Sequence, residues 1–336
     1  MGDYDKMRAD KGDLTMSTDK SISSQVQIED KLIESLLSSL FKGSSVQEIR
    51  YLSYAFTNKT ALVRFSSGER AVIKICVKED RFSKLKLEVD LIERISSETG
   101  LPVPKVLHKD LSMKKFQYPF VVYSFLPGEN LVDSIIHVKD KNRLGIELGR
   151  VAGQLHQITF DRPKFSLAAE DSQSSWIEII GAICKTGIDR LRESNYSRIA
   201  DAERYVQKNI AKIVEPKDYS LIHRDLQPQN LHWDSQSQKI VGIFDFESAM
   251  SGDRHFEFNF LERKLFKTYP DVRKGFYSSY SKHNRLDRNY EDIVKFYEVV
   301  RDLYFYDRDL HYGELDRANG DIESIERLIF DDWLVG

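Results

Sequence analysis

The amino-acid sequence predicts an α+β fold in two parts, an antiparallel sheet followed by a mainly helical region. Between residues 48 and 125, short runs of apolar and β-branched residues alternate with turn residues, which is typical of strands. Further along, apolar residues recur at helical spacing, over 131–138, 141–158, 175–194 and 199–212. A chain of 336 residues is long enough to bury the core of such a domain.

The first part of the chain contains the elements of a small lobe built on a sheet. Residues 1–27 are polar and are predicted to form a flexible tail, whereas the apolar spacing within 28–41 predicts a helix. Strands are predicted over 48–55, 61–65, 71–77 and 116–125. A helix predicted over 81–99 ends there because two prolines follow it closely. We therefore place one lobe at 28–126 and the other at 127–336.

The composition limits the classes of function. A formal net charge of −3 argues against a general nucleic-acid binder, although residues 301–336 are locally acidic, with ten Asp or Glu against four Arg. Cys76 and Cys184 are too few for a disulfide framework and predict buried thiols in a reducing compartment. No apolar run approaches the ~18–20 residues of a membrane span. We therefore expect a cytoplasmic protein without a membrane or nucleic-acid partner.

Two segments carry the strongest chemical signal: Leu-Ile-His-Arg-Asp-Leu-Gln-Pro-Gln-Asn-Leu at 221–231 and Gly-Ile-Phe-Asp-Phe-Glu at 242–247. They place a His-x-Asp-x-x-x-x-Asn unit ahead of a second Asp in an apolar strand. Phosphoryl transfer needs a carboxylate that accepts the proton of the attacking hydroxyl. It also needs an amide oxygen and a further carboxylate that hold Mg²⁺ on the nucleotide phosphates. We predict Asp225 as the catalytic base and Asn230 and Asp245 as metal ligands, with ATP or GTP as the donor.

A charged pair is predicted in the first lobe. Lys74 lies inside the apolar run 71–77, where a buried charge is costly unless it is paired. Glu88 falls within the apolar stripe of the following helix, so we predict that it pairs with Lys74 and that Lys74 holds the nucleotide phosphates. The alternatives are a lysine on an edge strand facing solvent and a glutamate that reaches water at the edge of its helix.

Two further segments are candidate nucleotide contacts. The loop 56–60 stands where a hairpin would cover the phosphates, and Thr57 and Asn58 are predicted to contact them. The loop contains no Gly-x-Gly-x-x-Gly, so an ordinary hairpin turn explains it nearly as well. The carbonyl of Ser124 and the amide of Leu126 are predicted to bind the nucleobase edge at the hinge between the lobes. Backbone contacts of this kind leave the choice between ATP and GTP open.

Other polar residues near the motifs have structural interpretations. His223 is predicted to pack inward, His156 to pack between helices, and Asp253 to cap a helix or fix a loop. Glu247 lies on the same strand face as Asp245, because side chains alternate along a strand. It is therefore a candidate for approaching the metal, directly or through another ligand.

Together these motifs resemble the aminoglycoside phosphotransferase family of small-molecule kinases. The matching elements run in family order: Val72-Ile-Lys74, Glu88, Leu101-Pro-Val-Pro104, 121–128, Leu155-His156, the His223 to Asn230 unit, Ile243 to Glu247, and Gly252-Asp253. The resemblance implies a two-lobed protein-kinase-like fold that uses Mg²⁺ with ATP or GTP. The sequence Asp-Phe-Glu in place of Asp-Phe-Gly, and the lack of an activation segment after it, disfavour a protein kinase.

The resemblance also implies that C-terminal helices close over the acceptor. There Asp302, Asp307 and Asp309 alternate with aromatic residues such as Tyr306, and with Glu247 they are predicted to bind a cationic acceptor. A solvated acidic helix face is the alternative. The favoured function is transfer of the γ-phosphoryl group to a hydroxyl of a small cationic molecule, such as an aminoglycoside-type antibiotic, by a monomer or weak dimer. The alternatives are a kinase for a metabolite (choline, homoserine or methylthioribose), a protein kinase and a nucleotide-binding pseudokinase.

Overall fold

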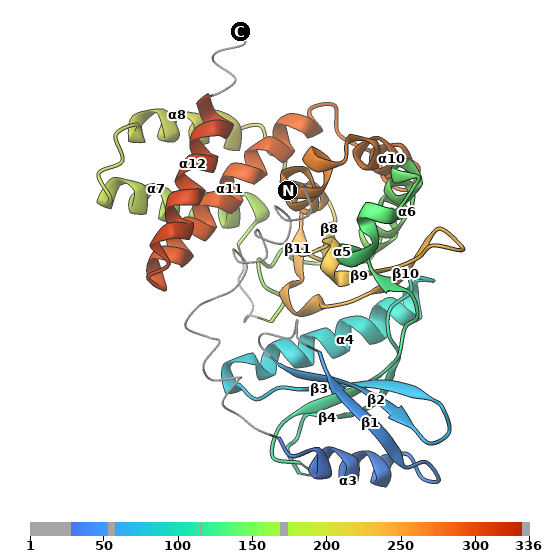
Figure 1. Cartoon of the computed structure of the whole chain (residues 1–336). Coiled ribbons are helices and arrows are strands. Elements are labelled where there is room, and N and C mark those ends of the chain that lie inside the picture. The colour runs from blue at the N-terminus through green and yellow to red at the C-terminus, as the bar shows by residue number, and fades with distance from the viewer. Residues whose placement is uncertain (1–27, 53–57, 115, 169–173, 331–336) are drawn as a thin grey trace. The chain divides into compact units, whose positions relative to one another are not determined.

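The structure contains two units, and the chain enters each of them twice (Figure 1). The computed structural model describes residues 28–52, 58–114, 116–168 and 174–330. The first unit comprises the described residues up to His137 together with Pro228–Glu247, and the second comprises Val138–Gln227 and the described residues from Ser248 onward.

A five-stranded antiparallel sheet organises the first unit, with strand order β1-β2-β3-β5-β4. Its strands are β1 (Val46–Tyr51), β2 (Lys59–Phe65), β3 (Arg70–Ile75), β4 (Val106–Asp110) and β5 (Phe120–Ser124). The antiparallel sheet is as predicted, but β4 has no counterpart among the predicted strands. It lies at the sheet edge with half-exposed and exposed side chains, so it lacks the apolar run that marks the other strands.

Two helices accompany this sheet, and each buries an apolar stripe. Helix α3 (Asp30–Leu40) packs Ile33 and Leu37 into a core that contains the inward side chains of β2 and β3. Helix α4 (Phe82–Glu98) follows the 3₁₀ turn η2 (Glu79–Arg81) and ends where the Thr99 hydroxyl donates to the Ile95 carbonyl over 2.7 Å. These helices agree with the apolar spacing in the sequence.

A smaller sheet links the end of the first lobe to the segment that carries the second motif. Its strands, in the order β10-β9-β6, are β6 (Glu129–Asn130), β9 (Leu231–Asp234) and β10 (Lys239–Ile243). Short helical turns adjoin it: α5 (Leu131–Ser134), η3 (Ile135–His137), η4 (Pro228–Asn230) and η5 (Phe246–Ser248). Because β6 pairs with β9, the first unit extends beyond residue 126.

The second unit is mainly helical. Its α-helices are α6 (Lys141–Leu155), α7 (Trp176–Glu193), α8 (Ile199–Ile210), α9 (Phe258–Phe260), α10 (Pro270–Tyr280), α11 (Tyr290–His311) and α12 (Leu315–Phe330). A 3₁₀ turn, η6 (Arg254–Glu257), precedes α9, and a π-helical stretch, η7 (Leu261–Phe266), follows it. A three-stranded sheet of order β11-β8-β7 contains β7 (Thr159–Phe160), β8 (Tyr219–Ile222) and β11 (Met250–Gly252).

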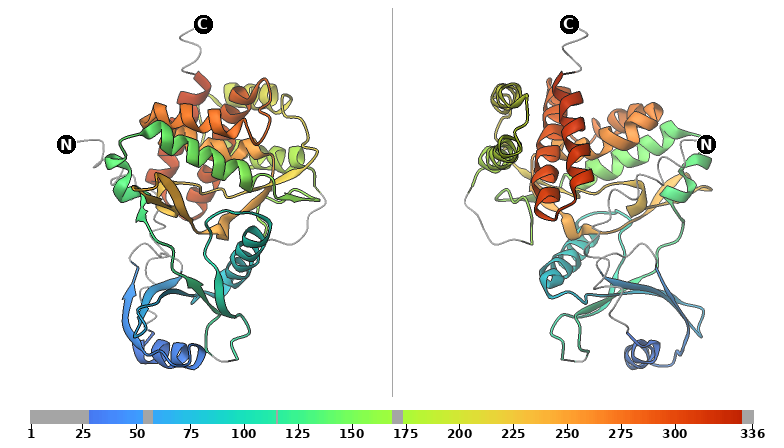
Figure 2. Two further views of the ribbon diagram at one scale, coloured as in Figure 1. Left: turned by 90° about the vertical axis from the view of Figure 1, so that its right-hand side faces the viewer. Right: turned by 60° about the vertical axis from the view of Figure 1, so that its left-hand side comes forward.

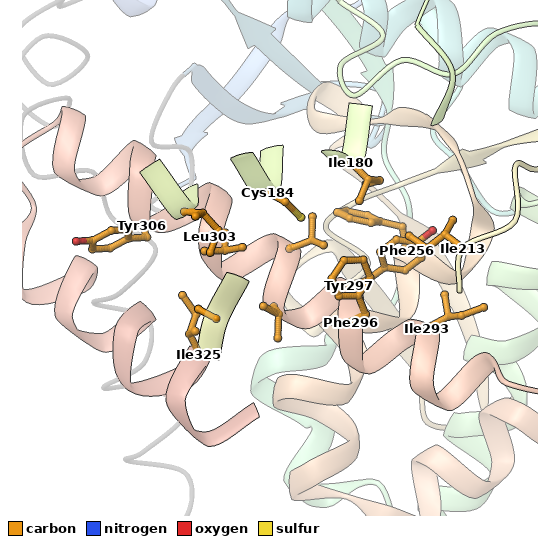
Figure 3. Packing of buried hydrophobic residues seen from close by; sticks show 14 of the residues in the cluster. Ile180, Cys184, Ile213, Phe256, Ile293, Phe296, Tyr297, Leu303, Tyr306 and Ile325 are labelled. Carbon is orange, nitrogen blue, oxygen red and sulfur yellow. The ribbon is translucent and has the colours of Figure 1, made fainter. Parts of the chain in front are cut away.

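Helices α7, α8, α11 and α12 surround one large apolar core (Figure 2). Cys184 of α7, Leu303 of α11 and Ile325 of α12 meet in it, and the rings of Phe256 and Tyr297 meet edge to face at one end (Figure 3). Both cysteines are free and buried, as predicted, and burial raises the pKa of the Cys184 thiol to about 12.

Helices α6 and α10 pack against each other backbone to backbone. A Cβ atom on Gly145 would lie 2.1 Å from the Val272 carbonyl oxygen, and one on Gly149 would lie 2.3 Å from that of Phe276. Gly145 and Gly149 are therefore needed for the close approach of the two helices. The contact residues advance together along both helices, so the two helices run parallel. Among the residues that the structure describes, no helix has the length and apolar character to cross a membrane.

Candidate active site

Lys74 stands on the central strand of the large sheet. Strand β3 pairs with β2 on one side and β5 on the other, and its residues Ala71, Ile73 and Ile75 are buried in the core. Because side chains alternate, Lys74 points to the opposite face, where only 12% of its side chain is exposed. There its ammonium group donates a hydrogen bond to Glu88 Oε2 from α4. The predicted Lys74–Glu88 pair is thus present.

Two more carboxylates approach the same ammonium group. Strand β10 ends at Ile243, Asp245 has a left-handed backbone, and Glu247 lies in the turn η5. The predicted shared strand face of Asp245 and Glu247 is therefore wrong, although both side chains come close to Lys74. Lys74 Nζ lies 3.7 Å from Asp245 Oδ1 and 3.8 Å from Glu247 Oε2. Burial lowers the pKa of Lys74, but the three carboxylates overcome this effect and raise it well above its usual value. Burial and the charges of Asp245 and Glu247 raise the pKa of Glu88, while Lys74 opposes this shift. The four groups form one electrostatic unit, which we call the carboxylate cluster.

The carboxylate cluster has the donor set that a magnesium ion prefers. Glu88, Asp245 and Glu247 each place one carboxylate oxygen within 4.8 Å of the others. Asp245 Oδ1 is buried and accepts no hydrogen bond, and Asp245 has a φ of 67°, a left-handed conformation that is unfavourable for this residue. Hard divalent cations bind carboxylate and amide oxygens. The residues present therefore fit Mg²⁺.

Asn230 is held beside the strand that leads to Asp245. It ends the turn η4, is 8% exposed, and its carbonyl accepts a hydrogen bond from the Phe244 amide over 3.0 Å. The Asn130 side chain braces the same turn by donating to the Gln229 carbonyl over 2.8 Å. The backbone thus brings the segments that carry Asn230 and Asp245 together.

The predicted nucleotide contacts are placed only in part. Asn58 is buried, and its Nδ2 donates to Glu247 Oε2 over 3.3 Å, a link that the sequence did not suggest. Thr57 lies outside the described residues. The Ser124 amide donates to the carbonyl of Lys105, the residue before β4, over 2.8 Å. Leu126 is half-buried beyond the end of β5. The nucleotide-binding roles of these residues stay predictions.

The loop that carries Asp225 belongs to the second unit and is fixed by a buried carboxylate. Glu257 is fully buried and accepts hydrogen bonds from the amides of His223 over 2.6 Å and Arg224 over 3.1 Å. Arg224 has a φ of 67°, so this strained backbone is held by the two bonds. His223 is buried, as predicted, and its Nδ1 accepts from the Asp225 amide over 3.2 Å.

The role of Glu257 was not predicted. Its signal in the sequence is a charged residue among aromatic ones, between Phe256 and Phe258.

His156, close to Glu257, is buried, and its Nδ1 lies 2.8 Å from the Tyr280 hydroxyl, as expected of a histidine packed between helices. Burial lowers the pKa of His156 and favours its neutral form. Asp253 caps η6 as predicted, because its Oδ1 accepts from the His255 amide over 3.0 Å.

The residues predicted to bind the acceptor on α11 are engaged with the protein itself. Asp302 is fully buried, and its Oδ1 accepts from Arg301 Nη2 over 2.8 Å and from Arg263. Other members of the set have similar partners: Asp307 with Arg190, Asp309 with Arg308, and the Tyr306 hydroxyl with that of Ser194. The expected open acidic surface is therefore wrong for Asp302, Asp309 and Tyr306, because helical spacing places these three on the buried side of α11.

Comparisons with known proteins identify the family and the fold of the chain. A model of the phosphotransferase enzyme family (APH) matches residues 48–285. No curated protein sequence matches the chain. Among solved structures, the GDP complex of wild-type aminoglycoside 2'-phosphotransferase-IIIa superposes with a TM-score of 0.66 at 16% identity, covering 90% of this chain and 100% of that one.

Two other solved structures show the same fold. Macrolide 2'-phosphotransferase MphH from Brachybacterium faecium has a TM-score of 0.64 at 16% identity, with 89% of this chain and 97% of that chain covered. A thermostable mutant of APH(4)-Ia, in ternary complex with ADP and hygromycin B, has a TM-score of 0.64 at 16% identity, with 88% and 97% covered. The predicted two-lobed, protein-kinase-like α+β fold is confirmed.

Proposed function

Because the chain belongs to the phosphotransferase enzyme family, we propose that it transfers the γ-phosphoryl group of ATP or GTP to a hydroxyl of a small molecule. The observation that carries this proposal is the carboxylate cluster, in which a buried lysine is paired with α4 beside two further carboxylates. Phosphoryl transfer is catalysed mainly by positioning and charge neutralisation, and this grouping provides the charges for both.

In the first unit, Lys74 would hold the phosphates of the nucleotide, and Glu88 fixes the position of Lys74. Asn230 and Asp245 would hold Mg²⁺, and Glu247, in the turn η5 that follows β10, would lie close to it. When bound, the ion neutralises charge on the phosphate oxygens. A buried Asp245 oxygen that accepts no hydrogen bond supports this assignment, since its hydrogen-bonding capacity is unused and the Lys74 ammonium group lies 3.7 Å from it. Other nucleotide contacts are assigned to Thr57, Asn58, Ser124 and Leu126.

In the second unit, Asp225 orients the acceptor hydroxyl and takes its proton as the new P–O bond forms. The bond between the γ-phosphorus and the bridging oxygen breaks, and the nucleoside diphosphate leaves. Asp225 Oδ1 accepts a hydrogen bond from Gln227 Nε2 over 2.6 Å, which fixes the carboxylate, and Glu257 fixes the loop behind it. A carboxylate held in this way is prepared for general-base catalysis.

For the acceptor we propose a cationic antibiotic of the aminoglycoside type or a related antibiotic. The similar structures are, by their descriptions, enzymes for aminoglycosides and macrolides. Glu247 and Asp307 remain candidates for binding the acceptor, whereas the buried residues Asp302, Asp309 and Tyr306 are left out of the proposal. A kinase for a small metabolite with the same fold is the second candidate.

The test is a coupled assay of ADP and GDP release with Mg-ATP and Mg-GTP. The acceptor panel contains aminoglycosides, macrolides, cyclic-peptide antibiotics, choline, homoserine and methylthioribose. Turnover of a cationic antibiotic supports the proposal. Turnover of a metabolite alone contradicts the proposed acceptor and identifies the chain as a metabolite kinase.

The matched variants are Asp225→Ala and, as a surface control on α7, Asp189→Asn. Asp225→Ala is expected to bind nucleotide but to lose about 10²–10⁴-fold in turnover, the usual contribution of a general base. The control is expected to keep full activity. Unchanged turnover in Asp225→Ala would remove the mechanism.

A further inference from the structure

We infer that Lys74 is the resident cation of the carboxylate cluster and that it weakens Mg²⁺ binding until a nucleotide's phosphates draw its ammonium group away from Asp245 and Glu247, with Glu88 still beside it. This inference rests on the proposed function and adds an order of binding to it. Free Mg²⁺ binds poorly to the protein alone, and the metal and the nucleotide bind together.

The geometry places the lysine where a metal ion has to compete with it. Lys74 Nζ hydrogen bonds to Glu88 and lies 3.7 Å from Asp245 Oδ1 and 3.8 Å from Glu247 Oε2. The Asp245 oxygen that faces it is the buried one that accepts no hydrogen bond. The ammonium group therefore provides the positive charge nearest to that oxygen within the described cluster.

Charge balance gives the direction of the effect. Three carboxylates and one ammonium group leave the cluster with a formal charge of −2, and removing the ammonium charge leaves −3. A divalent cation bound to Asp245 and Glu247 would lie close to the ammonium group, and like charges at that distance repel strongly where water is scarce. Phosphate groups relieve the conflict, because they give Lys74 new anionic partners.

Glu247 adds a second point of competition. Its Oε2 atom is approached by Lys74 and also accepts the hydrogen bond from Asn58 Nδ2 over 3.3 Å. Lys74 of β3 and Asn58, the residue just before β2, thus both contact this oxygen. A metal ion that binds through this oxygen has to displace both contacts.

The experiment measures Mn²⁺ binding, by electron paramagnetic resonance of the free ion, with no nucleotide and no acceptor present. Lys74→Gln is expected to bind Mn²⁺ about 10- to 100-fold more tightly than the unmodified protein, within the usual range of coupling between ligands. Lys74→Arg, which keeps the charge, is expected to bind as weakly as the unmodified protein. The matched control is Lys109→Gln, which removes an exposed lysine of β4 that is paired with Glu93.

Adding Asp245→Asn to Lys74→Gln is expected to abolish the tight binding, which places the metal in the carboxylate cluster. Equal Mn²⁺ affinity in Lys74→Gln and the unmodified protein would overturn the inference. The unmodified protein gives an independent test if Lys74→Gln does not fold. Without nucleotide it is expected to bind Mn²⁺ no more tightly than Asp245→Asn alone, and binding tenfold tighter than that variant overturns the inference.

The metal titration contains no acceptor, so its result is separate from the fate of the proposed function. If phosphoryl transfer is absent with every acceptor while Lys74→Gln binds Mn²⁺ tightly, the proposed function fails and the competition stands. If transfer occurs and the two affinities are equal, the function stands and the inference fails.

Discussion

Replacing Asp302 by alanine is expected to destabilise the helical unit strongly. The side chain is fully buried, and its Oδ1 accepts from Arg301 Nη2 over 2.8 Å, from Arg301 Nε over 3.2 Å and from Arg263. Removing one partner of a buried ion pair costs about 3–5 kcal/mol, because the other charge stays buried. Arg263 is 30% exposed and can turn to solvent, whereas Arg301 is 3% exposed. We therefore expect a loss of about 3 kcal/mol, mainly from Arg301.

Equilibrium urea denaturation, followed by circular dichroism, measures this loss as a change in the free energy of unfolding. Asp302→Asn keeps the shape and one acceptor oxygen, so its loss should be smaller, about 1–3 kcal/mol. The surface control is Asp189→Ala, whose carboxylate pairs with Lys185 on the exposed side of α7 and whose removal should leave stability unchanged. A loss in Asp302→Ala no larger than in that control, together with a weakened acceptor affinity, would restore Asp302 as an acceptor ligand.

Three further predictions concern the loop, a helix contact and pH. Glu257→Gln replaces the charged group that accepts hydrogen bonds from two loop amides, so kcat should fall about 10- to 100-fold while the KM for the nucleotide stays unchanged. The coupled assay measures both constants, and a kcat equal to that of the unmodified protein contradicts the prediction. Gly149→Ala should lower the free energy of unfolding by about 1–3 kcal/mol, measured by thermal unfolding, because the added Cβ would meet the Phe276 carbonyl. In the control, Gly320→Ala, the added Cβ lies in open space and should stabilise α12 slightly. Burial and the charge of Asp302 raise the pKa of Asp321 to about 7. Between about pH 4 and 7 the folded state therefore keeps a proton that the unfolded state releases, so the free energy of unfolding falls as pH rises. Asp321→Asn should therefore be about 2–4 kcal/mol more stable than the unmodified protein at pH 8 and equal to it near pH 4, by urea denaturation at both pH values.

The parts of the site that could be predicted are those that local patterns determine. Lys74 is a charged residue in an apolar strand and Glu88 is one in the apolar stripe of a helix. Each of them therefore predicts a partner of opposite charge, and the two form an ion pair in the structure. The motif around Asp225 and the spacing to Asp245 indicate the chemistry because residue type and spacing agree, although Asp245 lies just beyond the end of β10 and not within a strand. The family match supports that chemistry.

The parts that could not be predicted depend on contacts between distant segments. Asp302 looked like one of several acidic residues near the C-terminus, but helical spacing places it with Leu303 and Tyr306 against the core, and its partner Arg263 lies in another helix. Glu257 supports a loop more than thirty residues earlier in the chain. Neither contact leaves a local pattern in the sequence.

The way the chain returns to the first unit determines when that unit can be completed during synthesis. Strands β9 and β10, Asn230 and Asp245 all belong to Pro228–Glu247, and Ile243 donates from its amide to the Pro102 carbonyl over 2.9 Å. At ribosomal rates of about 5–20 residues per second, the 110 residues from Val138 to Glu247 take roughly 5–20 s to emerge. During that time the large sheet is present without the small sheet's last two strands and without Asp245. A nascent chain therefore gains its complete carboxylate cluster only after the whole first segment of the second unit, Val138–Gln227, has left the ribosome.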